Sequence, residues 1–293
     1  MLGGVNSKSL VYNSFNLDKD LTKVDPVKAL TSGKITSDYV GQTVYISNST
    51  CKCQEWIIIG INHDNTQGTV DLISKYWVAN NCYNIDGHFN GCSYLSNHIG
   101  IDGSNQFTCT DFDELYDKVI DGFSTSIKSN LSSITKTIWG NANADDGSGY
   151  QVYYNGMNHT SKMAMPSAKE LNLHTKYHYH DYRDYWIGST YEYFLNGGSA
   201  LMPSLDSEYI IKYGGGTYTC SYMLRDFYFS TGYNYMNCNG SSYPVSTDHG
   251  CSLRVVTNND DGTARSSAYV FMPYGSYGSH SHNLIGIIRF AKK

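Results

Sequence analysis

Residues 55–61 read EWIIIGI and residues 69–75 read TVDLISK. Both stretches are rich in β-branched residues, and the segment NHDNTQG between them has the Asn, Asp and Gly residues that turns favour. Together with TVYI at residues 43–46, they predict an antiparallel meander of strands. We therefore expect the sheet to begin near residue 41.

A helical period follows between residues 110 and 134, where Phe112, Leu115, Val119 and Phe123 fall on one face. We expect one helix that starts near Thr110 and a second, shorter one over 124–134.

Further strands are expected at 134–141 and 150–157, with NADDGSG (143–149) as a turn between them, and at 162–165. Ser167 and Glu170 then have capping-box spacing, which predicts a short helix through Leu173. From residue 185 the chain reads as strands to its end, so the predicted fold class is α+β.

Composition describes an unusual surface. Only 16% of the 293 residues are charged, against about 25% in ordinary soluble domains, whereas Tyr (27) and Gly (28) are abundant. A net charge of −5 gives no basic face for nucleic acid. Tyr, Ser, Gly and Asn together are typical of adaptable binding surfaces.

The chain is expected to have two parts. Residues 1–36 lack a clean hydrophobic period and are interpreted as an N-terminal arm for attachment, and residues 37–293 as one domain. We expect neither a signal peptide nor membrane insertion, because no basic segment followed by an apolar one opens the sequence and no long apolar run follows.

Two short motifs carry a family resemblance: SYMLRD at 221–226 and HGCSLRVV at 249–256. In order after EWIIIGI, TVDLISK and KMAMPSAKEL (162–171), they resemble the DUF6273-type domains of bacterial and bacteriophage proteins. The resemblance implies a C-type lectin-like fold, in the version shared with formylglycine-generating enzymes and the variable proteins of retroelements, with mixed antiparallel sheets, a few short helices and long loops.

The chain departs from the family pattern at two points. Met223 stands where the family has Trp, and the closing motif lacks its Pro. IGIIRFA at 285–291 is a second candidate for the closing strand. Arg225 and Arg254, within the matched motifs, are interpreted as structural residues that bind loop carbonyls or a carboxylate.

The candidate binding site is the uncharged run STGYNYMNCNGSSY at residues 230–243, in which Asn239 and Gly240 suit a tight turn. Its aromatic rings would stack on a sugar or pack on a protein, and its amides would hydrogen-bond hydroxyls or backbone. A rival contact segment, YGSYGSHSH at 274–282, has the same composition. The candidate ligand-binding residues are Tyr228, Tyr233, Asn234, Tyr235, Asn237, Asn239, Tyr243, Tyr274 and Tyr277.

The sequence gives less support for a metal site than for a binding segment. His174, His178 and His180 lack an accompanying HExxH or CxxC motif, and a solvated Tyr/His surface or a subunit contact is favoured over a metal site. The Asn/Asp/Gly runs at 143–149 and 258–263 are interpreted as turns rather than calcium sites.

Two groups of residues raise the alternative of an enzyme. Cys220 and Cys251 could be the reactive pair of an oxidase, but no cluster of basic residues surrounds them to activate a thiol. The carboxylates Asp181, Asp184, Glu192 and Glu208 could be imagined as a glycosidase pair. We predict no catalysis, no metal and no cofactor.

The resemblance to DUF6273-type domains therefore implies a bacteriophage virion structural protein, such as a tail fibre or surface adhesin, that binds a host surface glycan or protein. It would be made in the bacterial cytoplasm, would contact other virion proteins, and would form a homo-oligomer. The alternatives are an architectural capsid or tail decoration protein without a host ligand, and a bacterial surface protein or enzyme of the same fold.

Overall fold

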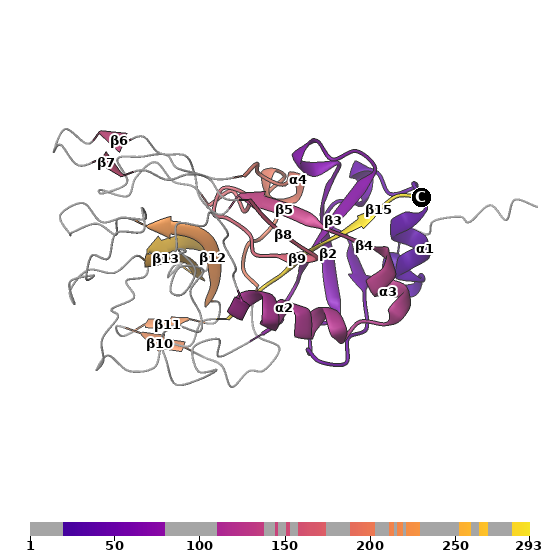
Figure 1. Cartoon of the computed structure of the whole chain (residues 1–293), viewed down its shortest axis with the longest axis horizontal. Coiled ribbons are helices and arrows are strands. Elements are labelled where there is room, and N and C mark those ends of the chain that lie inside the picture. Colours follow the sequence, from indigo (N-terminus) through magenta and orange to yellow (C-terminus); the bar gives the residue numbers. More distant parts are fainter. Residues whose placement is uncertain are drawn as a thin grey trace, which may run out of the picture.

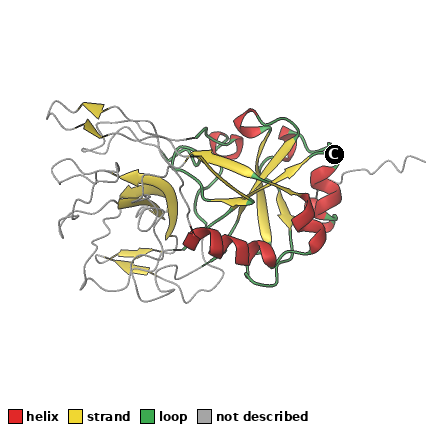
Figure 2. Cartoon of the chain, in the orientation of Figure 1, coloured by secondary structure: helices red, strands yellow, loops and turns green. Residues whose placement is uncertain are grey.

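The structure is a computed structural model that mixes short helices with antiparallel sheets (Figures 1 and 2). This agrees with the predicted α+β class. The structure describes residues 20–79, 110–137, 144–145, 151–152, 158–173, 188–202, 211–213, 216–218, 221–228, 252–258, 264–268 and 283–293.

The main sheet has the strand order β1-β2-β3-β15-β4, and β9 also pairs with β15. All of these pairings are antiparallel. The strands are β1 (Thr43–Tyr45), β2 (Glu55–Ile61), β3 (Thr69–Ser74), β4 (Leu131–Ser132), β9 (Met163–Ala164) and β15 (Ile287–Ala291). The predicted meander is confirmed as β1-β2-β3. Of the two candidate closing stretches, 285–291 supplies the strand that enters this sheet.

The main sheet is buried on both faces, which explains why its strands read as continuous apolar runs. Successive side chains of β2 enter opposite cores: Trp56 and Ile58 join one hydrophobic cluster, and Ile57 and Ile59 join the other. A bulge at the end of β2 places Gly60 opposite Asp71 of β3.

Residues 20–36 pack into the first core. The 3₁₀ helix η1 (Leu21–Lys23) and the helix α1 (Pro26–Thr31) bury Leu21, Ala29 and Leu30 almost completely. The backbone N–H of Lys293 binds the carbonyl of Thr31 at 2.8 Å, which brings the C-terminus beside α1, as Figure 1 shows. This part of the expected arm is therefore integral to the folded body, and residues 1–19 lie outside the described residues.

Three further α-helices and two 3₁₀ turns complete this body: α2 (Thr110–Asp121), α3 (Thr125–Asn130), α4 (Glu192–Leu195), η2 (Ser37–Tyr39) and η3 (His63–Asn65). Helix α2 confirms the predicted helical period. Helix α3 ends earlier than expected because the chain enters β4 at Leu131. Helix α4 falls in a region that we expected to be strands. No helix in the described part of the chain is both long and apolar enough to cross a membrane.

The predicted capping box at Ser167 is present, but it opens a single turn rather than a helix. The N–H of Glu170 binds Ser167 Oγ at 3.1 Å, and the N–H of Ser167 binds Glu170 Oε2 at 3.0 Å. Asn172 has a φ of 58°, and Leu173 donates back to the carbonyl of Ala168 at 2.8 Å. This left-handed C-cap ends the turn at once.

Four small antiparallel sheets accompany the main one. They are formed by β5 (Ile134–Thr137) with β8 (Asn158–Ser161), β6 (Ala144–Asp145) with β7 (Gln151–Val152), β10 (Ile211–Tyr213) with β11 (Gly216–Tyr218), and β12 (Ser221–Tyr228) with β13 (Ser252–Asn258) and β14 (Ala264–Ala268). The predicted turn at 143–149 therefore contains a short strand, β6. In Figure 1 the β12–β13 sheet lies at the opposite end of the body from α1.

Candidate functional site

A tight turn between β2 and β3 projects two titratable side chains over the second face of the main sheet. Asn62, Asp64 and Asn65 have φ values of 55°, 54° and 59°, a left-handed conformation that Asn and Asp tolerate best. Asn62 Oδ1 accepts the N–H of Gly68 at 2.7 Å, which closes the turn. The sequence predicted this turn, and the structure shows that it positions His63 and Asp64.

The side chain of Lys136 in β5 lies at the centre of a buried group of charges. Its Nζ is 2.7 Å from Asp64 Oδ2, 2.7 Å from Glu170 Oε1 and 3.1 Å from Tyr191 Oη. Only 5% of the Lys136 side chain is exposed. Each of its three ammonium protons therefore has an acceptor in the protein.

Glu170 is fully buried and joins Lys136 to Arg225 of β12. Its Oε2 accepts from Arg225 Nη1 and from the N–H of Ser167, which leaves Oε1 for Lys136. Burial alone would raise the pKa of Glu170, but Arg225 and Lys136 hold that pKa at about 2. The carboxylate is thus ionised throughout the ordinary pH range.

A second buried ion pair lies beside the first. Arg289 of β15 binds Asp71 of β3 with two hydrogen bonds, Nε to Oδ1 at 2.5 Å and Nη2 to Oδ2 at 2.6 Å. Tyr191 donates its hydroxyl to Asp71 Oδ2 at 3.1 Å. Because burial and the nearby carboxylates raise the pKa of Tyr191 well above its usual value, this hydroxyl stays protonated.

We call the residues Asp64, Asp71, Lys136, Glu170, Arg225 and Arg289 the charge network. Three acids and three bases make it neutral as a whole. His63 borders the charge network. Its ring stacks on the ring of Tyr191 with centroids 3.6 Å apart, and its Nε2 lies 3.2 Å from Asp64 Oδ1. Burial, opposed by the charge of Asp64, lowers the pKa of His63.

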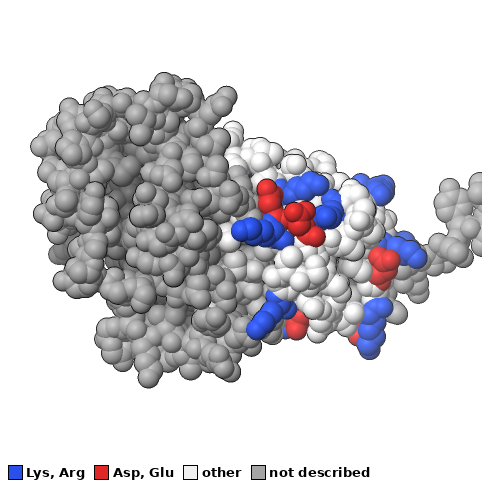
Figure 3. All heavy atoms as spheres, turned by 60° about the horizontal axis from the view of Figure 1, so that its bottom comes forward, with Lys and Arg blue, Asp and Glu red and all other residues white. Residues whose placement is uncertain are grey.

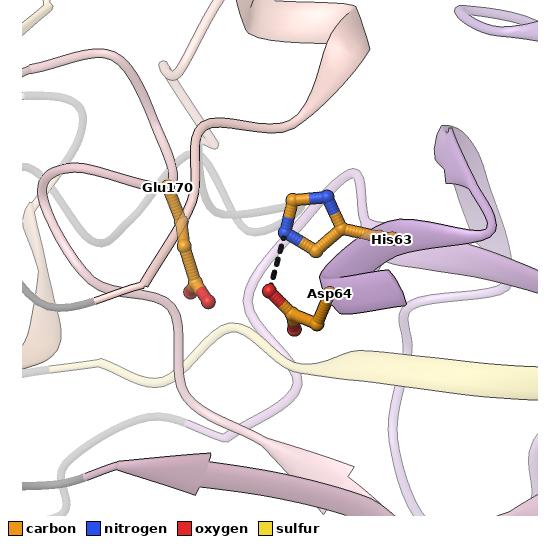
Figure 4. A group of neighbouring side chains, drawn as sticks. All are labelled: His63, Asp64 and Glu170. Atoms are coloured by element: carbon orange, nitrogen blue, oxygen red, sulfur yellow. Dashed lines mark ion pairs between the residues drawn. The ribbon is translucent and has the colours of Figure 1, made fainter. Parts of the chain in front are cut away.

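His63, Asp64 and Glu170 come close enough to raise the question of a metal ion (Figure 4), since their ligand atoms lie within 4.8 Å of one another. A metal would need to sit about 2.0–2.2 Å from each ligand atom. The Lys136 ammonium, however, already lies 2.7 Å from both carboxylates. The arrangement therefore suits an ammonium between two carboxylates, and we do not assign it as a metal site.

Arg225 joins the β12 sheet to this network through a bulge. Between Met223 and Phe227 strand β12 has two more residues than its partner β13, so the register shifts. The freed N–H of Arg225 binds the carbonyl of Pro166 at 3.0 Å, and Nη1 binds the carbonyl of Met165 at 2.8 Å. Backbone carbonyls and a carboxylate are the partners expected for a structural arginine.

Two further side chains of β12 are anchored in the second core. Leu224 is fully buried there, and so is Tyr222, whose hydroxyl donates to the carbonyl of Ala200 at 2.6 Å. The side chain of Arg254, the other predicted structural arginine, is not among the described ones, although its backbone pairs β13 with β14 opposite Ala268.

The two rival binding segments begin at the same end of this sheet. Tyr228 pairs with Ser252, so the chain leaves β12 and re-enters β13 at one place. Ala268, the last residue of β14, pairs with Arg254, two residues from Ser252. The segments that follow Tyr228 and Ala268 are therefore bracketed by neighbouring strand ends.

The predicted ligand-binding residues, from Tyr233 to Tyr243 with Tyr274 and Tyr277, lie outside the described residues, and of Tyr228 only the backbone is described. The same holds for the histidine cluster at 174–180, for Cys220 and Cys251, and for Asp181, Asp184 and Glu208. Glu192 is described, and its Oε2 accepts the hydroxyl of Ser37 at 3.2 Å on the surface.

Charge on the surface is mixed in sign. On the face shown in Figure 3, blue basic and red acidic side chains of the described residues stand side by side. Exposed pairs such as Lys23 with Asp20 and Lys128 with Asp121 illustrate this. The described residues on this face therefore form no one-signed field of the kind that attracts nucleic acid.

The comparisons with known proteins find no match for the chain. It matches no protein-family model, and neither a curated protein nor a solved structure is significantly similar to it. The resemblance to DUF6273-type domains therefore rests on the short motifs of the sequence.

Proposed function

We infer that this chain is a non-enzymatic structural protein of a bacteriophage particle, with a C-type lectin-like scaffold that presents the segment 230–243 to a glycan or protein of the host surface. The observation that carries the proposal is the firm attachment of β12 to the body. The chain passes directly from β12 into the segment 230–243, which has no charged residue. Tyr222, Leu224 and Arg225 tie β12 to the body. A rigid scaffold is what a variable contact segment needs.

The absence of enzymatic turnover on an external substrate is part of the proposal. The charge network satisfies its charges internally, and the acidic oxygens of Glu170 are taken by Lys136, Arg225 and Ser167. Cys51 and Cys53 are poor nucleophiles, because burial raises the pKa of their thiols to about 11 and about 12.

The test is binding of the purified, fluorescently labelled protein to a glycan array and to a panel of intact bacteria. We expect a subset of surfaces to bind. The double variant Tyr233→Ala/Tyr235→Ala should weaken that binding by at least about tenfold, because aromatic anchors dominate such contacts.

The matched control is Tyr45→Ala, which removes a tyrosine that is 46% exposed on β1 of the main sheet. It should bind as the unaltered protein does. A folded protein that binds no surface in either assay would overturn the proposal and favour the architectural alternative, in which the same residues contact neighbouring subunits.

A further inference from the structure

The environment of Lys136 is unusual for a simple ion pair. One ammonium is held by two carboxylates from distant parts of the chain, Asp64 at 2.7 Å and Glu170 at 2.7 Å, beneath the ring of Tyr191. A direct proton transfer from Lys136 Nζ to Asp64 Oδ2, the two atoms joined by the 2.7 Å hydrogen bond, gives the amine and the carboxylic acid from which an amide can form.

The pair is also placed for a covalent reaction. With Nζ 2.7 Å from Oδ2, the carboxyl carbon of Asp64 lies one bond further on, near the range of about 3–3.5 Å from which oriented groups react. Such orientation can replace the activation that amide formation needs in water. The side chain of Lys136 is 5% exposed and that of Asp64 28%, so bulk water has limited access to the nitrogen.

Glu170 has the position of a proton relay. Its Oε2 is occupied by Arg225 and by the N–H of Ser167, whereas its Oε1 faces only the Lys136 nitrogen among the hydrogen bonds that it makes. An acceptor held at 2.7 Å can take a proton from the nitrogen as the amide forms.

We propose that Lys136 and Asp64 form an intramolecular isopeptide bond, with Glu170 as the catalytic proton relay. The Lys136 amine attacks the carbon of the protonated Asp64 carboxyl group, and a C–N bond forms. Glu170 takes a proton from the nitrogen and passes it to the departing hydroxyl, so that the C–O bond breaks and one water leaves. Nothing is oxidised or reduced, and no other reactant is needed.

The bond would fasten β5 to the turn between β2 and β3, two segments 72 residues apart in the sequence. A covalent link there would brace the body from which the β12 sheet extends. The proposal does not depend on what the protein binds, and it holds or fails independently of the proposed function.

The test is the intact mass of the denatured protein by electrospray mass spectrometry. We expect a mass about 18 Da below that calculated from the sequence, the loss of one water. Lys136→Arg keeps the positive charge and should show no loss. Asp64→Asn should release ammonia instead and lose about 17 Da.

Peptide mapping locates the link. We expect one branched peptide that joins Lys136 to Asp64. Lys75 and Glu55 are the internal control: their contact of 2.5 Å is as short, but both are partly exposed, and no second carboxylate accepts from Lys75 Nζ among the described hydrogen bonds. Trypsin should cleave after Lys75 as usual.

Glu170→Gln should slow the bond, seen as a growing share of unlinked mass in freshly made protein. Because this variant removes a buried charge, its folding is checked by circular dichroism. The decisive result needs no variant: an unlinked mass for the unaltered, folded protein would overturn the proposal, as would an 18 Da loss that maps elsewhere.

Discussion

The buried pair of Asp71 and Arg289 gives the sharpest stability prediction. Asp71 accepts two hydrogen bonds from the guanidinium and a third from Tyr191 at 3.1 Å, and its side chain is fully buried. Asp71→Asn removes the carboxylate that binds Arg289 with two hydrogen bonds and leaves the guanidinium with only the more distant Asp64, whose Oδ2 is 3.9 Å from Nη2. Removing one partner of such a pair costs about 3–5 kcal/mol.

The matched control is Lys75→Gln, at the residue that directly follows β3 of the same sheet. The pair of Lys75 and Glu55 is as short, at 2.5 Å, but Lys75 is 38% exposed. Surface pairs contribute about 0–1 kcal/mol, so this variant should be nearly neutral. The double variant Asp71→Leu/Arg289→Met should recover much of the loss, because apolar residues of similar volume can replace a buried ion pair.

The assay is urea unfolding at neutral pH, followed by tryptophan fluorescence. Trp56 is fully buried against Phe123 and reports on the body. The free energy of unfolding follows from the midpoint and slope of each curve. If Asp71→Asn cost no more than Lys75→Gln, the network would not stabilise the sheet as we argue; a double variant no better than Asp71→Asn would show that the loss comes from packing.

Three further predictions concern the same body. Gly188→Ala should destabilise by about 1–3 kcal/mol more than Gly33→Ala in the same urea assay, because both have positive φ but only at Gly188 would a Cβ meet buried charged groups, at 2.8 and 2.9 Å. Burial raises the pKa values of the Cys51 and Cys53 thiols to about 11 and about 12, so both should resist iodoacetamide in the native protein near neutral pH and react fully in urea. Peptide mass mapping measures the labelling of each thiol, and fast labelling of the native protein would contradict their burial. Burial lowers the pKa of His63 in the folded protein, so the contribution of His63 to stability is fully present above the ordinary pKa of 6.5 and is lost as the pH falls below that value. His63→Gln should therefore reduce the fall of the urea midpoint in acid. An unchanged fall would exclude His63 as the source of the acid sensitivity.

Local patterns predicted most of the main sheet, for a physical reason. Strands β2 and β3 are buried on both faces, and a turn of Asn and Asp residues in left-handed conformation separates them, so their apolar runs and the punctuation between them are visible in the sequence. Helix α1 was missed because its six residues are too few to show a period. Its start was still readable, since Asp25 caps it and Pro26 follows as the first helical residue.

The charge network could not be predicted, because it joins segments that are remote in the sequence. Asp71 and Arg289 are 218 positions apart. Each carries a local signal, a lone charge inside an apolar strand, which implies a buried partner. The sequence does not say which partner, and only the pairing of β3 with β15, Arg289 opposite Asp71, brings the two together.

The network gives the fold a register that apolar packing alone would leave loose. A slip of β15 by one residue against β3 would separate Asp71 from Arg289 and bury each charge alone, at a cost of several kcal/mol. Glu170 does the same for the attachment of β12, because Arg225 has its carboxylate partner only when the bulge meets the capping-box turn. In the proposed function, the charges that specify the scaffold are thus kept inside it, and the segment 230–243, which has no charged residue, can change in sequence without disturbing any pair that holds the scaffold together.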